Sequence, residues 1–192
     1  MILLIDNYDS FTYNLAQYLG EANKSIKIIS NDYKDFNRIN FNRITHIVIS
    51  PGPGMPDDSK LSLQVIKIAL EMSKPLLGIC LGHQAIIENF GGSIINAFEV
   101  CHGKVHSIKH DSNSIMFNGI KNIFQATRYH SLVASKEFFP DCLEITAKTK
   151  LDNEIMAVQH RKKLIFGFQF HPESIETQYG LKMIENFINA IR

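Results

Sequence analysis

The chain has 192 residues, of which 45% are hydrophobic and 20% charged, and its formal net charge is +1. This length suits one domain with a substantial core, and the composition is ordinary for a globular protein. No run of lysine or arginine stands out, so charge gives no support for binding to nucleic acid or to a membrane surface. The opening MILLIDNYDSF lacks the basic segment of a signal peptide and the length of a membrane span.

The first half of the chain alternates short apolar runs with helical patterns. We expect strands at 1–5, 26–30, 45–50 and 75–79, and helices after Ser10, over 59–73, and from Cys80 to Gly91–Gly92. Short apolar strands separated by helices are typical of a parallel sheet buried on both faces. The sequence therefore predicts an open, mostly parallel, twisted α/β sheet with helices on both faces, of the flavodoxin-like kind.

From residue 93 to residue 170 the pattern changes, with few helical stripes. Short strand candidates lie at 92–97, 103–110, 122–130, 143–149, 154–160 and 164–170. We interpret them as mostly antiparallel strands that continue or flank the sheet. A last helix is expected over roughly 178–191, and no repeat or linker is visible, so we expect a single domain over 1–192.

The three cysteines, Cys80, Cys101 and Cys142, are far apart and odd in number, which argues against a disulfide framework. A reducing, cytoplasmic location fits this usage. Cys101 and Cys142 have no flanking pattern, so we interpret them as ordinary free cysteines, which are usually buried and inert.

Cys80, unlike the other two cysteines, has a flanking pattern: GICLG places it between two glycines at a predicted strand-to-helix turn. So tight a turn strains the nucleophile's backbone, and glycines two residues away relieve the crowding. The thiol would lie at the carboxyl edge of the sheet and at a helix N-terminus, which favours thiolate. The N–H of Leu81 can then point at a developing oxyanion. A metal site is the weaker alternative, because Cys80 and His83 are only two ligands.

A nucleophilic cysteine needs a base, and the base needs an orienting acceptor. His171 directly follows a predicted strand and opens HPES, with Glu173 two residues on to orient the imidazole. His83 is expected to support the helix start. His102 and His130 lie in loop-like segments, and either could line the site.

The segment SPGPGMP at 50–56 also follows a predicted strand, so it belongs at the same edge of the sheet. Its glycines let backbone N–H groups approach a ligand closely, and its prolines fix its path. The Walker spacing and lysine are absent, so an oxyanion or carboxylate contact suits this loop better than a phosphate. The alternative is a rigid turn without a ligand.

Four motifs occur in one order along the chain: PGPG, GICLGHQ, RYHSL at 128–132 and FQFHPES at 168–174. In this the whole chain resembles the class I glutamine amidotransferases. The opening IDNYDSFTYNLAQYLGE and HGK at 102–104 are similar to the glutaminase components (component II) of anthranilate synthase and 4-amino-4-deoxychorismate synthase. Cys101 departs from this pattern, where a methionine is expected.

The resemblance implies that Cys80 attacks the side-chain amide of L-glutamine to form a glutamyl thioester, with His171 as base oriented by Glu173. It also implies that the N–H groups of Leu81 and Gly52 hold the oxyanion. The remaining residues that match glutamine-binding positions are Pro53, Gly54, Gln84, Ser131 and Leu132.

The same resemblance implies that the ammonia passes to a chorismate-aminating synthase subunit (component I). The product would be anthranilate for tryptophan, or aminodeoxychorismate for folate, and one chain can serve both. No metal or organic cofactor is expected on this chain, and Mg²⁺ is expected only on the partner. We expect the partner near Asn7–Ser10 and His102–Lys104. Less favoured alternatives are a non-catalytic regulatory module on this fold and a cysteine peptidase.

Overall fold

The structure, a computed structural model, describes residues 1–21, 25–111 and 113–190. The strands are β1 (Ile2–Asp6), β2 (Ile26–Ser30), β3 (His46–Ile49), β4 (Leu76–Ile79), β5 (Ile94–Asn96), β6 (Lys104–His110), β7 (Ile123–Arg128), β8 (Leu132–Ala134), β9 (Leu143–Thr149), β10 (Ile155–His160) and β11 (Ile165–Phe168). The α-helices are α1 (Thr12–Glu21), α2 (Lys60–Glu71), α3 (Leu81–Asn89) and α4 (Gly180–Ile188). In this part of the chain, no helix is long and apolar enough to cross a membrane.

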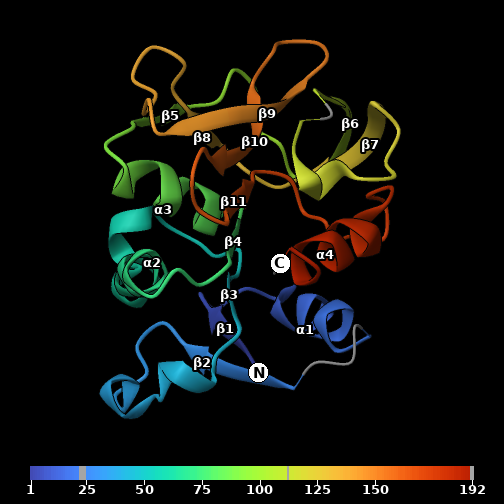
Figure 1. The fold of residues 1–192 in the computed structure, drawn as a ribbon. Helices are drawn as coiled ribbons and strands as arrows, with labels where there is room; N and C mark the ends of the chain where they lie inside the picture. Colours follow the sequence, from blue (N-terminus) through green and yellow to red (C-terminus); the bar gives the residue numbers. More distant parts are fainter. Residues whose placement is uncertain (22–24, 112, 191–192) are drawn as a thin grey trace.

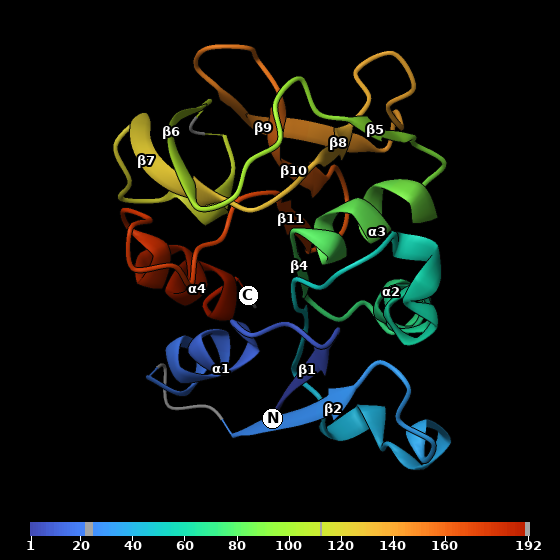
Figure 2. The same cartoon turned by 180° about the vertical axis from the view of Figure 1, so that it is seen from behind.

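The main sheet has the strand order β2-β1-β3-β4-β11-β10-β9-β6-β7, with β5 and β8 paired separately. Strands β2, β1, β3, β4 and β11 are parallel, which confirms the predicted α/β sheet. Helices α1 and α4 cover one face of this half, and α2 and α3 cover the other (Figures 1 and 2). The residues that these helices bury include Leu15, Leu19, Met183 and Phe187 on the first face, and Val65, Ile66, Ala85 and Ile86 on the second.

The second half of the chain supplies an antiparallel extension, formed by β10, β9, β6 and β7. The expected antiparallel strands are therefore present, and one strand of this region, β11, pairs in parallel with β4 as well as antiparallel with β10. This strand therefore joins the two halves of the sheet. A continuous apolar strand has the same sequence pattern whether its neighbours are parallel or antiparallel. The sequence IFGF therefore does not indicate which strands β11 pairs with.

Two helix ends also differ from the expectation. Ser10 does not cap α1: the carboxylate of Asp9 accepts from the N–H of Phe11 at 2.8 Å, and that of Asp6 accepts from the Thr12 hydroxyl at 2.8 Å. The last helix begins at Gly180 rather than at 178, and residue 191 lies outside the described residues.

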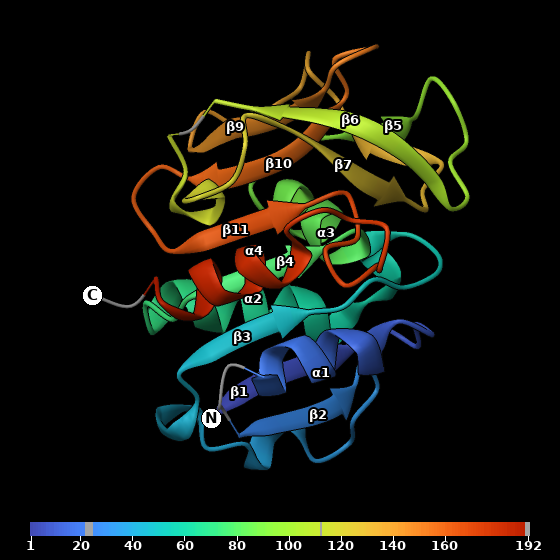
Figure 3. The ribbon, with the colours of Figure 1, turned by 90° about the vertical axis from the view of Figure 1, so that its right-hand side faces the viewer.

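The carboxyl ends of the parallel strands lie at one edge of the sheet. Figure 3 shows β3 and β11 ending on the same side, where the segments that follow them gather. Ligand sites of open α/β sheets lie at this edge. The fold therefore brings the segments 50–56, 80–84 and 169–174 together.

Candidate active site

Cys80 lies in the turn between β4 and α3, where its backbone has φ of 51° and ψ of −101°. Non-glycine residues rarely adopt positive φ, so the turn holds this residue in a strained conformation. Both neighbouring glycines are required by packing. A Cβ at Gly78 would lie 2.4 Å from the backbone of Gly82, and a Cβ at Gly82 would lie 2.8 Å from the carbonyl oxygen of Ile49. The G-x-C-x-G pattern is therefore a packing requirement of the turn.

His171 follows β11, and its N–H donates to the carbonyl of Thr127 at 3.0 Å. Its Nδ1 lies 2.7 Å from Oε1 of Glu173, and both side chains are buried. Burial alone would lower the pKa of His171, but hydrogen bonding and charge interaction with Cys80 and Glu173 outweigh it and raise that pKa to about 10. Cys80 and Glu173 together therefore favour the protonated form of the imidazole.

The thiol and the imidazole share a small buried environment. The sulphur of Cys80 accepts a hydrogen bond from Nε2 of Gln169 at 3.6 Å and lies 3.9 Å from the carbonyl oxygen of Tyr129. The rings of Phe11 and Tyr129 pack edge-on against His171, at centroid distances of 5.9 and 5.1 Å. Nε2 of His171 is buried and makes no hydrogen bond of regular geometry with the described residues. This nitrogen is therefore available for proton exchange with the thiol.

A cavity of about 190 Å³ opens at Cys80. Its lining consists of Gly52, Pro53, Gly54, Cys80, Leu81, Gln84, Tyr129, His130, Ser131 and Leu132. All seven residues predicted to bind glutamine or the oxyanion are therefore gathered around the predicted nucleophile. Their individual roles remain predictions.

The PGPG loop is braced against the end of β1. A Cβ at Gly52 would lie 2.4 Å from Cβ of Asn7, so only glycine fits there. The Asn7 side chain donates to the carbonyl of Ser50 at 3.0 Å, and its Oδ1 accepts from the hydroxyls of Ser59 at 2.5 Å and Ser62 at 3.1 Å. These contacts fix the position of the loop relative to the end of β1.

The other wall of the cavity is the segment 129–132. Nε2 of Gln84 donates to the carbonyl of Leu132 and to Oε1 of Gln169, both at 3.0 Å. From outside, the loop 97–103 donates backbone hydrogen bonds to this wall: Ala97 to Ser131 at 2.8 Å and Cys101 to His130 at 2.9 Å. The wall is therefore held from both sides.

Comparison with known proteins agrees with this geometry. The family model for "Glutamine amidotransferase class-I" matches residues 3–191. The chain belongs to the class I glutamine amidotransferase family. It is 52% identical to "Anthranilate synthase component 2" of Cyanophora paradoxa, covering all of both chains. It is 47% identical to "Aminodeoxychorismate/anthranilate synthase component 2" of Bacillus subtilis, covering all of this chain and 97% of that one.

Among solved structures, the amidotransferase resembles a protein of Thermoplasma acidophilum described as part of a GMP synthase. The two share a TM-score of 0.84 and 25% sequence identity, over 98% of this chain and 92% of that chain. A glutamine amidotransferase of Thermotoga maritima shares the fold, with a TM-score of 0.77 at 16% identity, covering 98% of this chain and 80% of that one.

Two residues of the amidotransferase site, Tyr129 and Gln169, were not predicted to take part, and a third, His130, was left undecided. Tyr129 and His130 belong to RYHSL, beside the two residues that were predicted, and His130 was left as one of two histidines that could line the site. The structure places His130 in the cavity wall, whereas His102 is exposed outside it, with its ring 5.5 Å from that of Tyr129. Only the fold shows that Gln169 reaches the sulphur.

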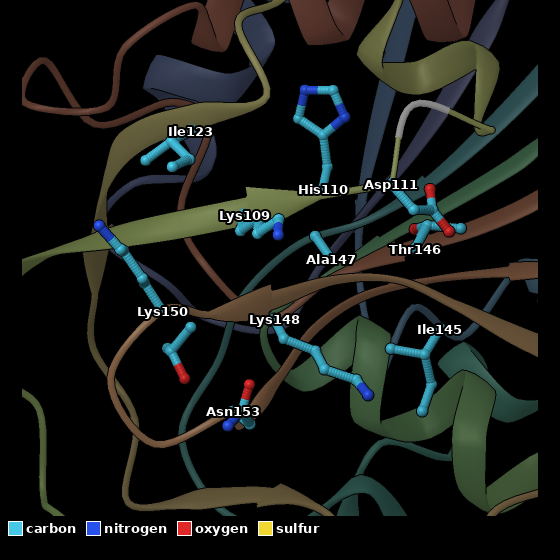
Figure 4. A pocket seen from close by; sticks show the side chains of 11 residues that line it. Lys109, His110, Asp111, Ile123, Ile145, Thr146, Ala147, Lys148, Lys150 and Asn153 are labelled. Atoms are coloured by element: carbon cyan, nitrogen blue, oxygen red, sulfur yellow. The ribbon is translucent and has the colours of Figure 1, made fainter.

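A larger hollow of about 530 Å³ lies on the antiparallel extension of the amidotransferase, over β6 and β9 (Figure 4). Lys109, Lys148 and Lys150 line it, and no described cysteine does. It therefore lacks the nucleophile of the smaller cavity. Within the described ranges, no three histidine, cysteine or acidic side chains are grouped so that they could hold a metal ion.

Proposed function

We propose that this chain is the glutaminase component of a chorismate-aminating synthase, and that it hydrolyses L-glutamine to glutamate and ammonia. The observation that supports this most directly is the cavity at Cys80, whose wall holds the seven predicted substrate residues beside the His171–Glu173 pair. The printed names of the relatives support the wider assignment, since they are second components of anthranilate and aminodeoxychorismate synthases.

The chemistry uses the residues in a fixed order. The sulphur of Cys80 attacks the carbonyl carbon of the glutamine side chain, and the N–H groups of Leu81 and Gly52 hold the oxygen that becomes negative. His171 then gives its proton to the nitrogen of the breaking C–N bond, and ammonia leaves a glutamyl thioester. In the second half, His171 takes a proton from water, which attacks the thioester and releases glutamate. Glu173 stabilises the imidazolium throughout.

The ammonia passes to a synthase subunit that aminates chorismate. In the principal form of the proposal the product is anthranilate, for tryptophan. The dual name of the Bacillus subtilis relative supports the alternative that the product is aminodeoxychorismate, for folate, or that the chain serves both. We assign no metal or organic cofactor to this chain and place any Mg²⁺ requirement on the partner. A cytoplasmic location is part of the same proposal.

The partner is proposed to dock over two loops that meet beside the site. Tyr8, in the loop after β1, is exposed, as is His102, in the loop before β6. Tyr129 contacts both segments, since its ring is 5.3 Å from that of Phe11, which follows the first loop, and 5.5 Å from that of His102 in the second. A partner on these loops would cover the mouth of the cavity and receive ammonia without its crossing bulk water. It would also order the site, so we expect little glutaminase activity from the isolated chain.

The test is to capture the partner with the tagged chain, supply glutamine and chorismate, and identify the aromatic product. Anthranilate supports the principal form, and aminodeoxychorismate supports the folate alternative. Glutamine hydrolysis without amination of chorismate would contradict the partner assignment. Strong glutamine hydrolysis by the isolated chain, unchanged when the partner is added, would contradict the proposal that the partner orders the site.

A further inference from the structure

His130 is a buried histidine in the wall of the glutamine cavity that the mechanism above does not use. It follows β7, is only 6% exposed, and lines the cavity together with Cys80. Its Nε2 accepts a hydrogen bond from Nε of Arg128 at 3.0 Å. Arg128 is itself buried and forms an ion pair with Glu154, so the group that contacts His130 has a fixed position.

This contact determines which nitrogen of His130 carries the proton. A guanidinium group can only donate hydrogen bonds, so Nε2 must present its lone pair. The proton of the neutral ring is then on Nδ1. Burial and the positive charge of Arg128 lower the pKa of His130 to about 3, so the ring is neutral at physiological pH. His130 is therefore held as a neutral donor with its N–H at Nδ1.

The donor at Nδ1 has no hydrogen-bond acceptor among the described residues, although it is buried. The backbone of Leu132 lies near enough to the imidazole to favour its protonated form, but no hydrogen bond of regular geometry joins it to Nδ1. Buried polar groups of native proteins are nearly always paired, and one left unpaired is costly. A ligand in the cavity is the natural acceptor for a donor in the cavity wall.

The cavity offers a reason for such a donor. Glutamine carries an α-carboxylate, yet no lysine or arginine is among the described residues that line the cavity. His130 directly precedes Ser131 and Leu132, which are predicted to bind the amino-acid end of glutamine. Nε2 of His130 accepts a hydrogen bond from Arg128, and this polarises the N–H at Nδ1 of the same ring. Hydrogen bonds linked in such a chain strengthen one another, so Nδ1–H becomes a stronger donor.

We propose that Nδ1–H of His130 donates a hydrogen bond to the α-carboxylate of glutamine, with Arg128 and Glu154 as the positioning residues that fix its tautomer. This rests on the proposed function, because it names a further contact of the same substrate. It makes His130 a determinant of specificity for a ligand that carries this carboxylate.

Two substitutions separate the nitrogens of the ring. The amide of an asparagine reaches the position of Nδ1, whereas that of a glutamine reaches the position of Nε2. His130→Asn therefore keeps a donor towards the cavity and leaves Arg128 without its acceptor. His130→Gln keeps the acceptor for Arg128 and removes the donor. His160→Gln, at the end of β10 and outside the cavity lining, is the matched control.

The readout is the concentration dependence of Cys80 labelling by 6-diazo-5-oxo-L-norleucine, an electrophilic glutamine analogue that carries the α-carboxylate. A hydrogen bond to a charged group predicts half-saturation at about 10- to 100-fold higher concentration in His130→Gln. His130→Asn should stay within a few-fold of the unmodified chain. Iodoacetamide has no carboxylate, so its rate of alkylation of Cys80 should be the same in all of these proteins.

The outcomes are distinct. Weak labelling confined to His130→Gln, with unchanged iodoacetamide alkylation, supports the proposal. Near-normal labelling of His130→Gln, or equal weakening of both variants, overturns it, because the ring then serves only Arg128 or packing. A parallel loss of iodoacetamide reactivity also overturns it, since the turn itself is then disturbed. If the unmodified chain is not labelled at Cys80, the proposed function fails instead.

Discussion

Nδ1 of His171 lies 2.7 Å from Oε1 of Glu173, and both side chains are almost completely buried. The carboxylate has two effects here: it orients the ring, and its charge favours the imidazolium. A substitution that keeps the first effect and removes the second separates them.

Glu173→Gln is such a change, because it keeps an acceptor of the same shape without the charge. We expect it to lower the pKa of His171 from about 10, since the Glu173 carboxylate is one of the two groups that raise it. We also expect glutaminase kcat, in the complex with the partner, to fall by about 100-fold or more. An NMR titration of the imidazole signals measures the pKa. The same midpoint in both proteins would contradict the assignment.

The raised pKa also predicts how stability depends on pH. The folded-state pKa of His171 lies above its ordinary value of 6.5, so protonation of this ring stabilises the fold fully below pH 6.5. That contribution is lost as the pH rises towards about 10. The difference in melting temperature between the unmodified chain and Glu173→Gln should therefore shrink over this range. A difference that stays constant with pH would show that the ring is not charged.

The nucleophile is tested by chemical labelling. An electrophilic glutamine analogue should modify Cys80 and leave Cys101 and Cys142 largely unmodified, because only Cys80 lines the cavity. Cys80→Ser should lose at least about 1,000-fold of the glutaminase activity, since the weaker nucleophile cannot replace the thiolate. Mass spectrometry of the labelled chain locates the adduct. Full activity of Cys80→Ser would exclude the proposed mechanism.

The strained turn predicts an unusual order of stabilities at position 80. Cys80→Gly should be more stable than Cys80→Ala by about 1 kcal/mol, because only glycine adopts positive φ without steric cost. At an unstrained helix position the order is the reverse. Urea unfolding of the two inactive variants gives the comparison. An alanine variant as stable as the glycine variant would show that the φ of 51° at this residue is not a source of strain.

The oxyanion contact is tested at Gly52. In Gly52→Ala the new methyl group would lie 2.4 Å from Cβ of Asn7, so the PGPG loop must move. Loss of one oxyanion donor predicts a fall in kcat of about 100- to 1,000-fold. Gly20→Ala is the control, because a Cβ there is 3.9 Å from Ile26 and the helix gains an alanine. Equal activity of the two variants would remove Gly52 from the oxyanion site.

The buried ion pair of Arg128 and Glu154 predicts strong coupling. Arg128→Met should destabilise the fold by about 3–5 kcal/mol, because it leaves a carboxylate buried without its cation. Adding Glu154→Gln removes that charge and keeps an acceptor for the N–H of Phe98, so the double variant should be more stable than Arg128→Met alone. A double-mutant cycle, with the free energy of unfolding measured in urea, gives the interaction energy between the two positions. If the effects of the two substitutions simply add, the predicted coupling between Arg128 and Glu154 is wrong.

The parallel half of the sheet could be predicted from the sequence almost residue by residue. The strand expected at 26–30 has those bounds, and the helix expected over 59–73 covers Lys60–Glu71. Continuous apolar runs and helical periodicity carry this information locally. The positions of Cys80 in a strand-to-helix turn and of His171 after a strand were likewise predictable, because both follow from local patterns, whereas their catalytic roles stay predictions.

The contacts that join distant segments could not be predicted. Nothing in IFGF shows that β11 pairs with β4, and nothing in RYHSL shows that Arg128 pairs with Glu154. Arginine is seldom buried, so the sequence alone suggests that Arg128 lies on the surface. The tautomer of His130 depends on that arginine, which is why the sequence left this histidine undecided.

The pairing of β4 with β11 has a consequence for the order in which the protein becomes active. These adjacent strands lead to the proposed nucleophile and its proposed base, yet 91 residues separate Cys80 from His171 along the chain, and β5 to β10 lie between them. During synthesis the Cys80 turn is made before the segment that carries His171 and Glu173. A nascent chain that stops before β11 carries the thiol without its proton acceptor. The proposed site is therefore complete only after β11 has been made and has paired with β4.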